Sequence, residues 1–504
     1  MNRTRKFFAN SVSMALCQLI VMLAGFITPK VMLHYYGSEV NGLVSSINQF
    51  VSYFYLVEMG LSAATVYALY KPLAENNHNA INAVVSAANK FYTQAGYIFV
   101  SLTLGLAIIY PMLVKTDALT PINIGILVLV LGVNGALEFF TLSKYRAIIS
   151  ADQRAYVISY ATIAYIIINT SIIVILARLG VGIVLLQTIA LLSIFLRSII
   201  LMVYVKIKYK YIDYKVEPNT AVLDKRWDAL YQQILGIIYK SSPVIILTLF
   251  VKDLTLVSIY TIFNIIMLGI GGILEIFMSG LSASFGDVIA RKEKGTLQRA
   301  FREFEFVYYG LITIVYGVAF VTIMPFIRIY TEGITDAVYD NTIIGFLMVL
   351  NGLFYNLKVP QGMLVISAGM YKETRVQVTI QACLILIGGI ILSFYWGIIG
   401  VLVAAILSNV YRDIDLLFFV PKKITSLPVK STIFRWINIM CSLIIICVPF
   451  YFIEMEPSGY ITWFLYAMMV AIYGVLVILC SGYIFEKSEM KNITRRITSI
   501  VRTR

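Results

Sequence analysis

The chain has 504 residues, of which 60% are hydrophobic and only 13% are charged, and its formal net charge is +14. A soluble domain is nearer half apolar and a quarter charged, so this composition excludes a soluble globular protein. It predicts an all-α polytopic membrane protein. No nucleic-acid-binding module accompanies the positive charge, which excludes nucleic acid as the partner.

Fourteen stretches along the chain are long and apolar enough to cross a bilayer, which takes about 20 residues in a helix. Continuous apolar runs indicate helices, because lipid leaves no water to satisfy an open backbone and a barrel would show alternating segments of about 10 residues. In chain order the stretches are 11–32, 43–70, 86–113, 122–142, 156–177, 182–205, 228–251, 255–285, 305–327, 341–367, 376–395, 398–420, 433–453 and 461–485. We therefore expect about 14 transmembrane helices.

The positive charges orient this bundle. With the amino terminus in the cytoplasm, 31 of the 40 Lys and Arg residues fall on the cytoplasmic side, five fall in outer loops and four lie within helices. This bias satisfies the positive-inside rule. It predicts a multi-pass protein of the plasma membrane with both termini in the cytoplasm, whose basic runs contact anionic membrane lipids.

A short repeat indicates how the helices are organised. Residues 60–64 read Gly-Leu-Ser-Ala-Ala and residues 280–284 read Gly-Leu-Ser-Ala-Ser, and an even number of spans separates them. That spacing is typical of parallel repeats related by an axis along the membrane normal. The alternative is a chance match of the small residues with which transmembrane helices pack.

The repeat predicts two six-helix lobes in pseudo-two-fold arrangement. The amino-terminal lobe would comprise residues 1–210 and the carboxy-terminal lobe residues 211–424. The long basic loop 206–226, which contains Pro218, divides them. Residues 425–504 would add two further helices and a basic cytoplasmic tail.

Three segments carry a resemblance to a known family. Residues 35–42 read Tyr-Tyr-Gly-Ser-Glu-Val-Asn-Gly, residues 58–64 read Glu-Met-Gly-Leu-Ser-Ala-Ala, and residues 253–265 contain Ser-Ile-Tyr. With the order of six, six and two helices, they resemble bacterial polysaccharide-repeat flippases of the multidrug/oligosaccharidyl-lipid/polysaccharide exporter superfamily. The resemblance implies a flippase of the bacterial cytoplasmic membrane.

The resemblance also implies the cargo and the pathway. Such a protein moves an undecaprenyl-diphosphate-linked oligosaccharide from the cytoplasmic to the outer leaflet by alternating access, for the export of cell-surface polysaccharide. Glycosyltransferases and a polysaccharide polymerase of the same pathway are then the expected partners. The identity of the sugar repeat unit depends on the shape of the cavity, which no motif encodes.

Cations within the spans are the candidate partners of a diphosphate, because charge in the membrane interior is costly and marks functional sites. Lys240 precedes Ser-Ser-Pro in the seventh stretch, Lys358 lies in the tenth, and Arg197 lies in the sixth. Lysine meets phosphate as a point charge, whereas arginine binds it bidentately. The structural alternatives are that Arg197 holds a neighbouring helix and that the lysines pair with carboxylates.

Carboxylates and neutral polar groups supply the other candidate roles. Glu58 and Glu275 lie inside spans and are candidates for proton coupling or ion pairing, since a buried carboxylate takes up a proton readily. Glu138 is nearer the cytoplasmic edge, and Arg412, Asp413 and Asp415 are interpreted as a local ionic cluster. The candidate sugar contacts are Tyr53, Tyr55, Tyr67, Asn356 and Gln361.

No motif indicates an enzyme, a cofactor or a metal site. The chain lacks a Walker A sequence, and its two His and five Cys residues show no zinc-ligand spacing. A membrane glycosyltransferase or polysaccharide polymerase is one alternative, although short outer loops disfavour it. A drug or cation exporter of the same superfamily is another, but it usually has 12 helices. The extra pair favours lipid-linked cargo, as in lipid II flippases, where such a pair lines a groove for the lipid tail.

Overall fold

A computed structural model describes residues 3–58, 60–218, 227–278, 281–453, 455–492 and 495. All regular secondary structure in these residues is helical, and twelve of the helical runs are long and apolar enough to span a membrane. The prediction of an all-α polytopic membrane protein is confirmed. Each of the fourteen predicted stretches is helical over nearly all of its described residues.

The chain forms two compact units, Met1–Ile262 and Phe263–Arg504. The division falls inside one helix, α10 (Leu254–Met278). The lobe limits after residues 210 and 424 remain predictions, as does the pseudo-two-fold repeat. One end of that repeat, Gly280, lies outside the described residues, as do residues 219–226 of the dividing loop.

Unit 1 begins with a helical run that covers the first two predicted spans. Its bounds are α1 (Arg3–Phe54), a 3₁₀ turn η1 (Tyr55–Glu58) and α2 (Leu61–Ala74). Two glycines with positive φ interrupt it, Gly37 at 82° and Gly60 at 81°. Only glycine adopts that region at little cost, so these two residues place the kink and the turn. The gap predicted between the first two spans, which end at residue 32 and begin at residue 43, therefore corresponds to a kink within one helical run.

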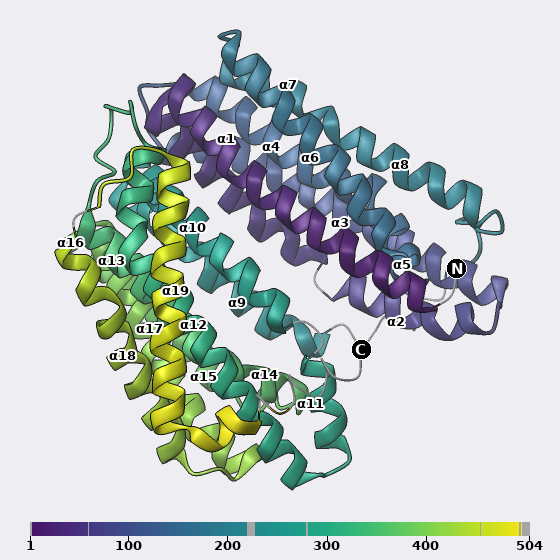
Figure 1. Ribbon diagram of the computed structural model, residues 1–504. Coiled ribbons are helices and arrows are strands. Elements are labelled where there is room, and N and C mark those ends of the chain that lie inside the picture. The colour runs from purple at the N-terminus through teal and green to yellow at the C-terminus, as the bar shows by residue number, and fades with distance from the viewer. Residues whose placement is uncertain are drawn as a thin grey trace. The chain divides into compact units, whose positions relative to one another are not determined.

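The remaining helices of unit 1 pack side by side. They are α3 (His78–Leu113), α4 (Pro121–Thr141), α5 (Ser143–Ala151), α6 (Ala155–Arg178), α7 (Ile183–Leu191), α8 (Ser193–Lys208), α9 (Trp227–Ile246) and the π-helical turn η3 (Leu247–Val251). Helix α3 packs along α4, and α1 packs along α6. Helices α7 and α8 run nearly end to end as one span (Figure 1). Leu43, Phe99, Leu127 and Phe139 occupy the centre of the apolar core.

Polar contacts connect the second half of α1 to α9, η3 and the start of α10. Asn41 donates to the Ser258 hydroxyl over 2.8 Å, and the hydroxyls of Ser46 and Thr248 share a hydrogen bond of the same length. Between these contacts the backbones nearly touch, because a Cβ on Gly42 would lie 1.8 Å from the carbonyl oxygen of Leu254. Only glycine fits there.

A charged and aromatic cluster closes one end of unit 1, outside the spans. Asp152 accepts hydrogen bonds from Lys6 at 2.9 Å and from Tyr209 at 2.7 Å, and it pairs with Arg154. Burial alone would raise the pKa of Asp152, but these donors hold it below its usual value. Nearby, burial lowers the pKa of Lys144, whose ammonium lies over the rings of Tyr145 and Tyr214.

Unit 2 is organised around α12 (Lys294–Tyr330), a helix of 37 residues. Its other elements are α11 (Leu281–Ala290), α13 (Thr342–Leu357), α14 (Val359–Ser367), α15 (Arg375–Cys383), η4 (Leu384–Gly388), α16 (Gly389–Trp396), α17 (Ile398–Val420), η5 (Pro421–Thr425), α18 (Val429–Phe452) and α19 (Tyr460–Phe485). Helices α13, α18 and α19 contact α12, and α19 runs beside it in Figure 1. The two carboxy-terminal helices are thus packed into unit 2.

The helix pair α13 and α14 meets at Lys358. This residue ends α13, and Pro360 stands near the start of α14. Proline lacks a backbone N–H and so interrupts the helical hydrogen-bond ladder. The interruption places a lysine at the junction of two helices inside the candidate span Thr342–Ser367.

Candidate functional site

Lys240 is an exposed cation within the candidate span Ile234–Val251. It makes no hydrogen bond or ion pair with any residue that the structure describes. The polar residues that follow it are bonded within the protein: Ser241 bonds to Gln49 of α1, and the Ser242 hydroxyl donates to the carbonyl oxygen of Ile238 in its own helix. Pro243 lies inside the same helix. Lys240 therefore presents a positive charge that the described part of the chain leaves without a counter-ion.

Lys358 is half-buried and surrounded by polar groups. Its ammonium donates to Oδ1 of Asn409 and lies 4.7 Å from the ring centroid of Tyr355. Asn409 in turn donates to Oδ1 of Asn351 over 2.9 Å. The amides therefore fix the position of the ammonium.

Asp413 interacts with Lys358 electrostatically but not through a hydrogen bond. It lies on α17, one turn after Asn409, and it is 3% exposed. Neither of its carboxylate oxygens accepts a hydrogen bond from the described residues. Arg412 turns instead to Asp415. The ionic cluster predicted at Arg412, Asp413 and Asp415 thus separates into the local pair Arg412–Asp415 and an aspartate within electrostatic range of Lys358.

Arg197 pairs with Glu138. Its guanidinium donates to Oε1 of Glu138 over 2.8 Å and lies 5.8 Å from the ring centroid of Tyr165. The pair joins α8 to α4, which is the helix-holding role that the sequence left open. A role for Arg197 in binding diphosphate stays a prediction.

The two candidate coupling carboxylates have different surroundings. Glu58 is half-buried at the end of η1, within electrostatic range of Arg146 and Glu138. Glu275 is exposed on α10 and interacts electrostatically with Tyr355. Among the described residues neither glutamate forms an ion pair, so Glu58 does not pair with Lys240 and Glu275 does not pair with Lys358.

The three candidate tyrosines also lie in different surroundings. Tyr53 hydrogen-bonds to the hydroxyls of Ser241 and Ser242 on α9. Tyr55 packs into the core with its ring 5.3 Å from that of Phe99. Tyr67 is 74% exposed. Tyr53, on α1, is therefore the one that interacts with the part of α9 that carries Lys240.

Asn356 and Gln361 belong to an internal network of unit 2. Asn356 accepts from Tyr308 and donates to Tyr316, and Gln361 donates to Oε1 of Glu305 over 2.8 Å. Their exposures are 6% and 2%. Their amides are thus already bonded within the protein, which favours a structural role over the predicted contact with sugar.

A buried ion triad continues this network into the carboxy-terminal helices. Arg435 on α18 donates to Glu305 of α12 over 2.7 Å and, through Nε, to Glu486 after α19, also over 2.7 Å. The side chains of Arg435 and Glu305 are 6% and 1% exposed. Sequence reasoning missed the triad because Arg435 lies near a helix end, where a cation is expected at the interface. The available signal was an acidic residue at the start of the predicted span 305–327 and a basic residue near the start of the predicted span 433–453.

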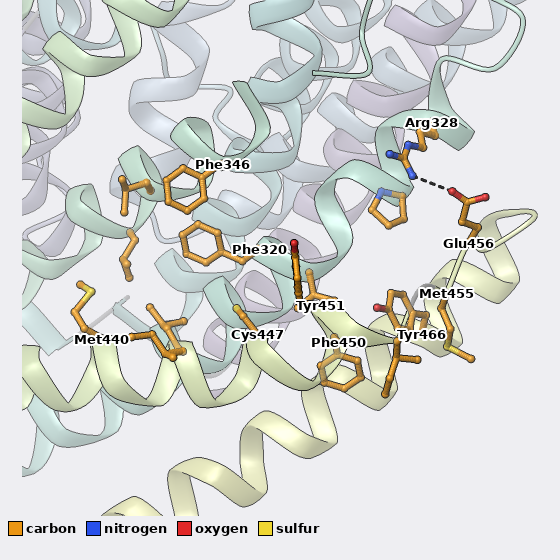
Figure 2. A pocket seen from close by; sticks show the side chains of 17 residues that line it. Phe320, Arg328, Phe346, Met440, Cys447, Phe450, Tyr451, Met455, Glu456 and Tyr466 are labelled. Atoms are coloured by element: carbon orange, nitrogen blue, oxygen red, sulfur yellow. Dashed lines mark hydrogen bonds and ion pairs between the residues drawn. The ribbon is translucent and has the colours of Figure 1, made fainter. Parts of the chain in front are cut away.

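An apolar groove of about 700 Å³ runs along unit 2. Figure 2 shows Phe320 from α12, Phe346 from α13 and Met440 and Phe450 from α18 along its wall. At its mouth Arg328 donates to Glu456 over 3.2 Å, and it also pairs with Asp340. The groove thus has an apolar wall and one cation at its mouth.

Comparisons with known proteins define the fold. No protein-family model and no curated relative matches the sequence. Among solved structures, an inward-facing multidrug resistance MATE family transporter of the MOP superfamily is similar, with a TM-score of 0.65 and 14% identity over 84% of this chain and 99% of that chain. The lipid II flippase MurJ, in an inward closed conformation, has a TM-score of 0.64 and 16% identity over 95% of this chain and 98% of that one.

A MOP superfamily transporter from Pyrococcus furiosus is also similar, with a TM-score of 0.54 and 13% identity over 82% of this chain and 96% of that one. The protein is therefore a multi-pass membrane protein with the fold of MOP superfamily transporters. At these identities the likeness concerns the fold alone.

Proposed function

We propose that the protein is a flippase that moves undecaprenyl-diphosphate-linked oligosaccharide from the cytoplasmic to the outer leaflet by alternating access, for export of surface polysaccharide. Lys240 is the observation that carries this proposal. A lysine inside a span is costly without a counter-ion. A diphosphate that passes through the protein supplies that counter-ion transiently, whereas a structural lysine would hold a carboxylate permanently.

The carboxy-terminal helices support a cargo with a lipid tail. The MurJ flippase aligns with 95% of this chain, whereas the MATE transporter aligns with 84%. The apolar groove along α12, α13 and α18 offers a path for hydrocarbon, because burial of apolar surface stabilises it by roughly 25 cal/mol per Å². In this proposal the hydrocarbon tail lies along α18.

The other candidate residues take supporting roles. Lys358 and Arg197 are secondary candidates for the diphosphate, since each has a partner within the protein. Glu58 and Glu275 remain the candidates for coupling transport to a proton. Glycosyltransferases and a polymerase of the same pathway are the proposed partners.

A drug or cation exporter is the second candidate, because MATE transporters share the fold. Such an exporter has to attract cations, and the exposed Lys240 repels them. A membrane glycosyltransferase or polymerase has less support, because the solved structures that share this fold include transporters and a flippase.

Transport of a fluorescent lipid-linked oligosaccharide in proteoliposomes tests the proposal. We expect the wild-type protein to move the lipid between leaflets and Lys240→Ala to abolish this movement. Lys294→Ala, which removes an exposed lysine at the start of α12, is the matched control and should retain it. Export of organic cations with no movement of the lipid would contradict the proposal in favour of the second candidate.

A further inference from the structure

Unit 1 contains a cavity of about 250 Å³ between α1, α4, α6 and α7. None of its 16 lining residues is charged. Five of them are amides, namely Asn41, Asn48, Asn134, Asn169 and Gln187. Thr28, Ser45 and Tyr165 add three hydroxyls. Half of the lining is thus neutral and polar, in helices that are otherwise strongly apolar.

Three of the amides have a structural explanation. Polar side chains in membrane proteins hydrogen-bond between helices. Asn41 donates to Ser258, Asn169 accepts from Ser193 over 3.0 Å, and Asn134 bonds to Tyr165. Each of these bonds uses only part of what an amide offers, which is two N–H donors and a carbonyl acceptor.

The other two amides have no such explanation. Asn48 on α1 and Gln187 on α7 form no hydrogen bond with any described residue, although both line the cavity. Asn48 is exposed and Gln187 is half-buried, both within candidate membrane spans, where a polar side chain without a partner is unfavourable. Two such side chains directed at one cavity indicate that something which enters it completes their hydrogen bonds.

The chemistry of the lining limits what that ligand is. A diphosphate is bound by Lys or Arg, and a cation is bound by carboxylates or rings of carbonyls. A neutral ring that carries several hydroxyls matches amides and hydroxyls, because each hydroxyl donates and accepts. Sites for drug-sized ligands measure about 300–1,000 Å³, so a cavity of this size suits a single sugar ring.

We propose that this cavity is a carbohydrate subsite that binds one neutral sugar of the cargo through Asn48 and Gln187. The inference rests on the proposed flippase function. It assigns the sugar to a cavity of unit 1 that Lys240, the proposed partner of the diphosphate, does not line. It also replaces the sugar contacts predicted at Asn356 and Gln361, whose amides are bonded within unit 2.

The test compares binding of three lipids to purified full-length protein in nanodiscs. The probes are undecaprenyl diphosphate, the same lipid bearing one glucose, and the same lipid bearing one N-acetylglucosamine. We expect at least one sugar-bearing lipid to bind about tenfold more tightly than the bare diphosphate. Asn48→Leu and Gln187→Leu should each remove most of this gain and leave binding of the bare lipid unchanged.

Thr188→Val is the matched control. Thr188 is exposed beside Gln187, bonds only to the carbonyl oxygen of Val184 in its own helix, and does not line the cavity. It should keep the full gain. A gain that persists in both leucine variants would overturn the proposal, and so would equal binding of all three lipids by the wild type. Failure of every lipid to bind would instead contradict the proposed function.

A second measurement does not depend on the leucine variants folding. In a protein with its five native cysteines replaced, Ser45→Cys places a thiol in the cavity wall and Thr188→Cys places one outside. We expect the sugar-bearing lipid, but not the bare lipid, to slow alkylation of position 45 by N-ethylmaleimide about tenfold, with no effect at position 188. Unchanged alkylation at position 45 would overturn the subsite.

Discussion

Asp413 and Lys358 interact electrostatically in unit 2 without a hydrogen bond between them. The ammonium of Lys358 donates to Asn409, and both carboxylate oxygens of Asp413 lack a donor among the described residues. The carboxylate therefore depends on its counter-charge more than on hydrogen bonds. This dependence makes the pair sensitive to loss of either member.

Removal of one member should destabilise the protein more than removal of both. Breaking a buried ion pair in contact costs about 3–5 kcal/mol, and each single change should cost less here because the two charges are not in contact, whereas replacing both partners by apolar residues is often neutral. We expect Lys358→Met and Asp413→Leu each to lower the melting temperature in detergent and the double variant to recover most of the loss. If Lys358 also binds diphosphate, the double variant should be stable but inactive in transport. Single variants as stable as the wild type would contradict the pairing.

Lys240→Ala should abolish complementation of a flippase-deficient strain while membrane insertion and melting temperature stay unchanged. Loss of a charge that meets a desolvated phosphate costs roughly 2–5 kcal/mol. Lys240→Arg should retain some activity, because it keeps the charge. The double variant Lys240→Ala with Glu58→Gln should stay inactive, since the structure places no ion pair between these residues. Recovery of activity in that double variant would show that Lys240 serves only as a pairing partner.

Single cysteines should reveal the sidedness that the positive charges predict. A cysteine at Lys210 or after Lys487 should react with a membrane-impermeant maleimide only in inverted vesicles. A cysteine at Asp336 should react only in intact cells. Asp336 follows the carboxy-terminal end of α12, which is the end predicted to lie on the outer side of the membrane. Labelling of position 210 from outside would reverse the predicted topology.

The cluster at Asp152 predicts a stability difference at acidic pH. The pKa of Asp152 is lowered in the folded protein, from about 3.9 in an unfolded chain. Its pairing with Lys6, Arg154 and Tyr209 therefore stabilises the fold fully above about pH 4 and is lost as the pH falls through the folded pKa. We expect Asp152→Asn to lower the melting temperature at pH 7 and to differ less from the wild type near pH 3. A difference that does not change with pH would contradict this account.

Arg435→Ala should loosen the carboxy-terminal helices from α12. It leaves the Glu305 carboxylate, which is 1% exposed, without its cation. The expected loss of stability is about 3–5 kcal/mol, measured as a lower melting temperature and faster proteolysis between α17 and α18. Arg299→Ala, which removes an exposed arginine of α12, is the control and should have no effect.

Much of the architecture follows from the sequence because apolar length alone decides whether a segment crosses a membrane. The helix bounds of α4 and α6 lie within one residue of their predicted stretches for that reason, whereas α3 begins at His78, well before its stretch 86–113. Gly37 was not predicted as a kink, since a backbone angle leaves no trace in hydropathy. The charged residues within the spans were recognised one by one, but their partners were not. Pairing of Lys358 with Asp413 depends on how α17 packs, and no local pattern encodes that packing.

The candidate site was harder to predict for a related physical reason. An amide inside a span can join helices, as Asn356 does, or remain open to a ligand, as Asn48 does. Both residues look alike in sequence. The distinction depends on whether a tertiary neighbour uses the amide. The cavity in unit 1 collects side chains from four helices spread over more than 150 residues of sequence.

The Glu305–Arg435 pair has a consequence for biosynthesis. The two residues are 130 positions apart, and Glu305 enters the membrane first. At roughly 5–20 residues per second, the ribosome delivers Arg435 about 6–26 s after Glu305. During that interval α12 carries an acidic side chain without its basic partner, at the start of the predicted span 305–327. Arrival of α18 supplies the counter-charge, so the last two helices complete the ion pairing of a segment translated well before them.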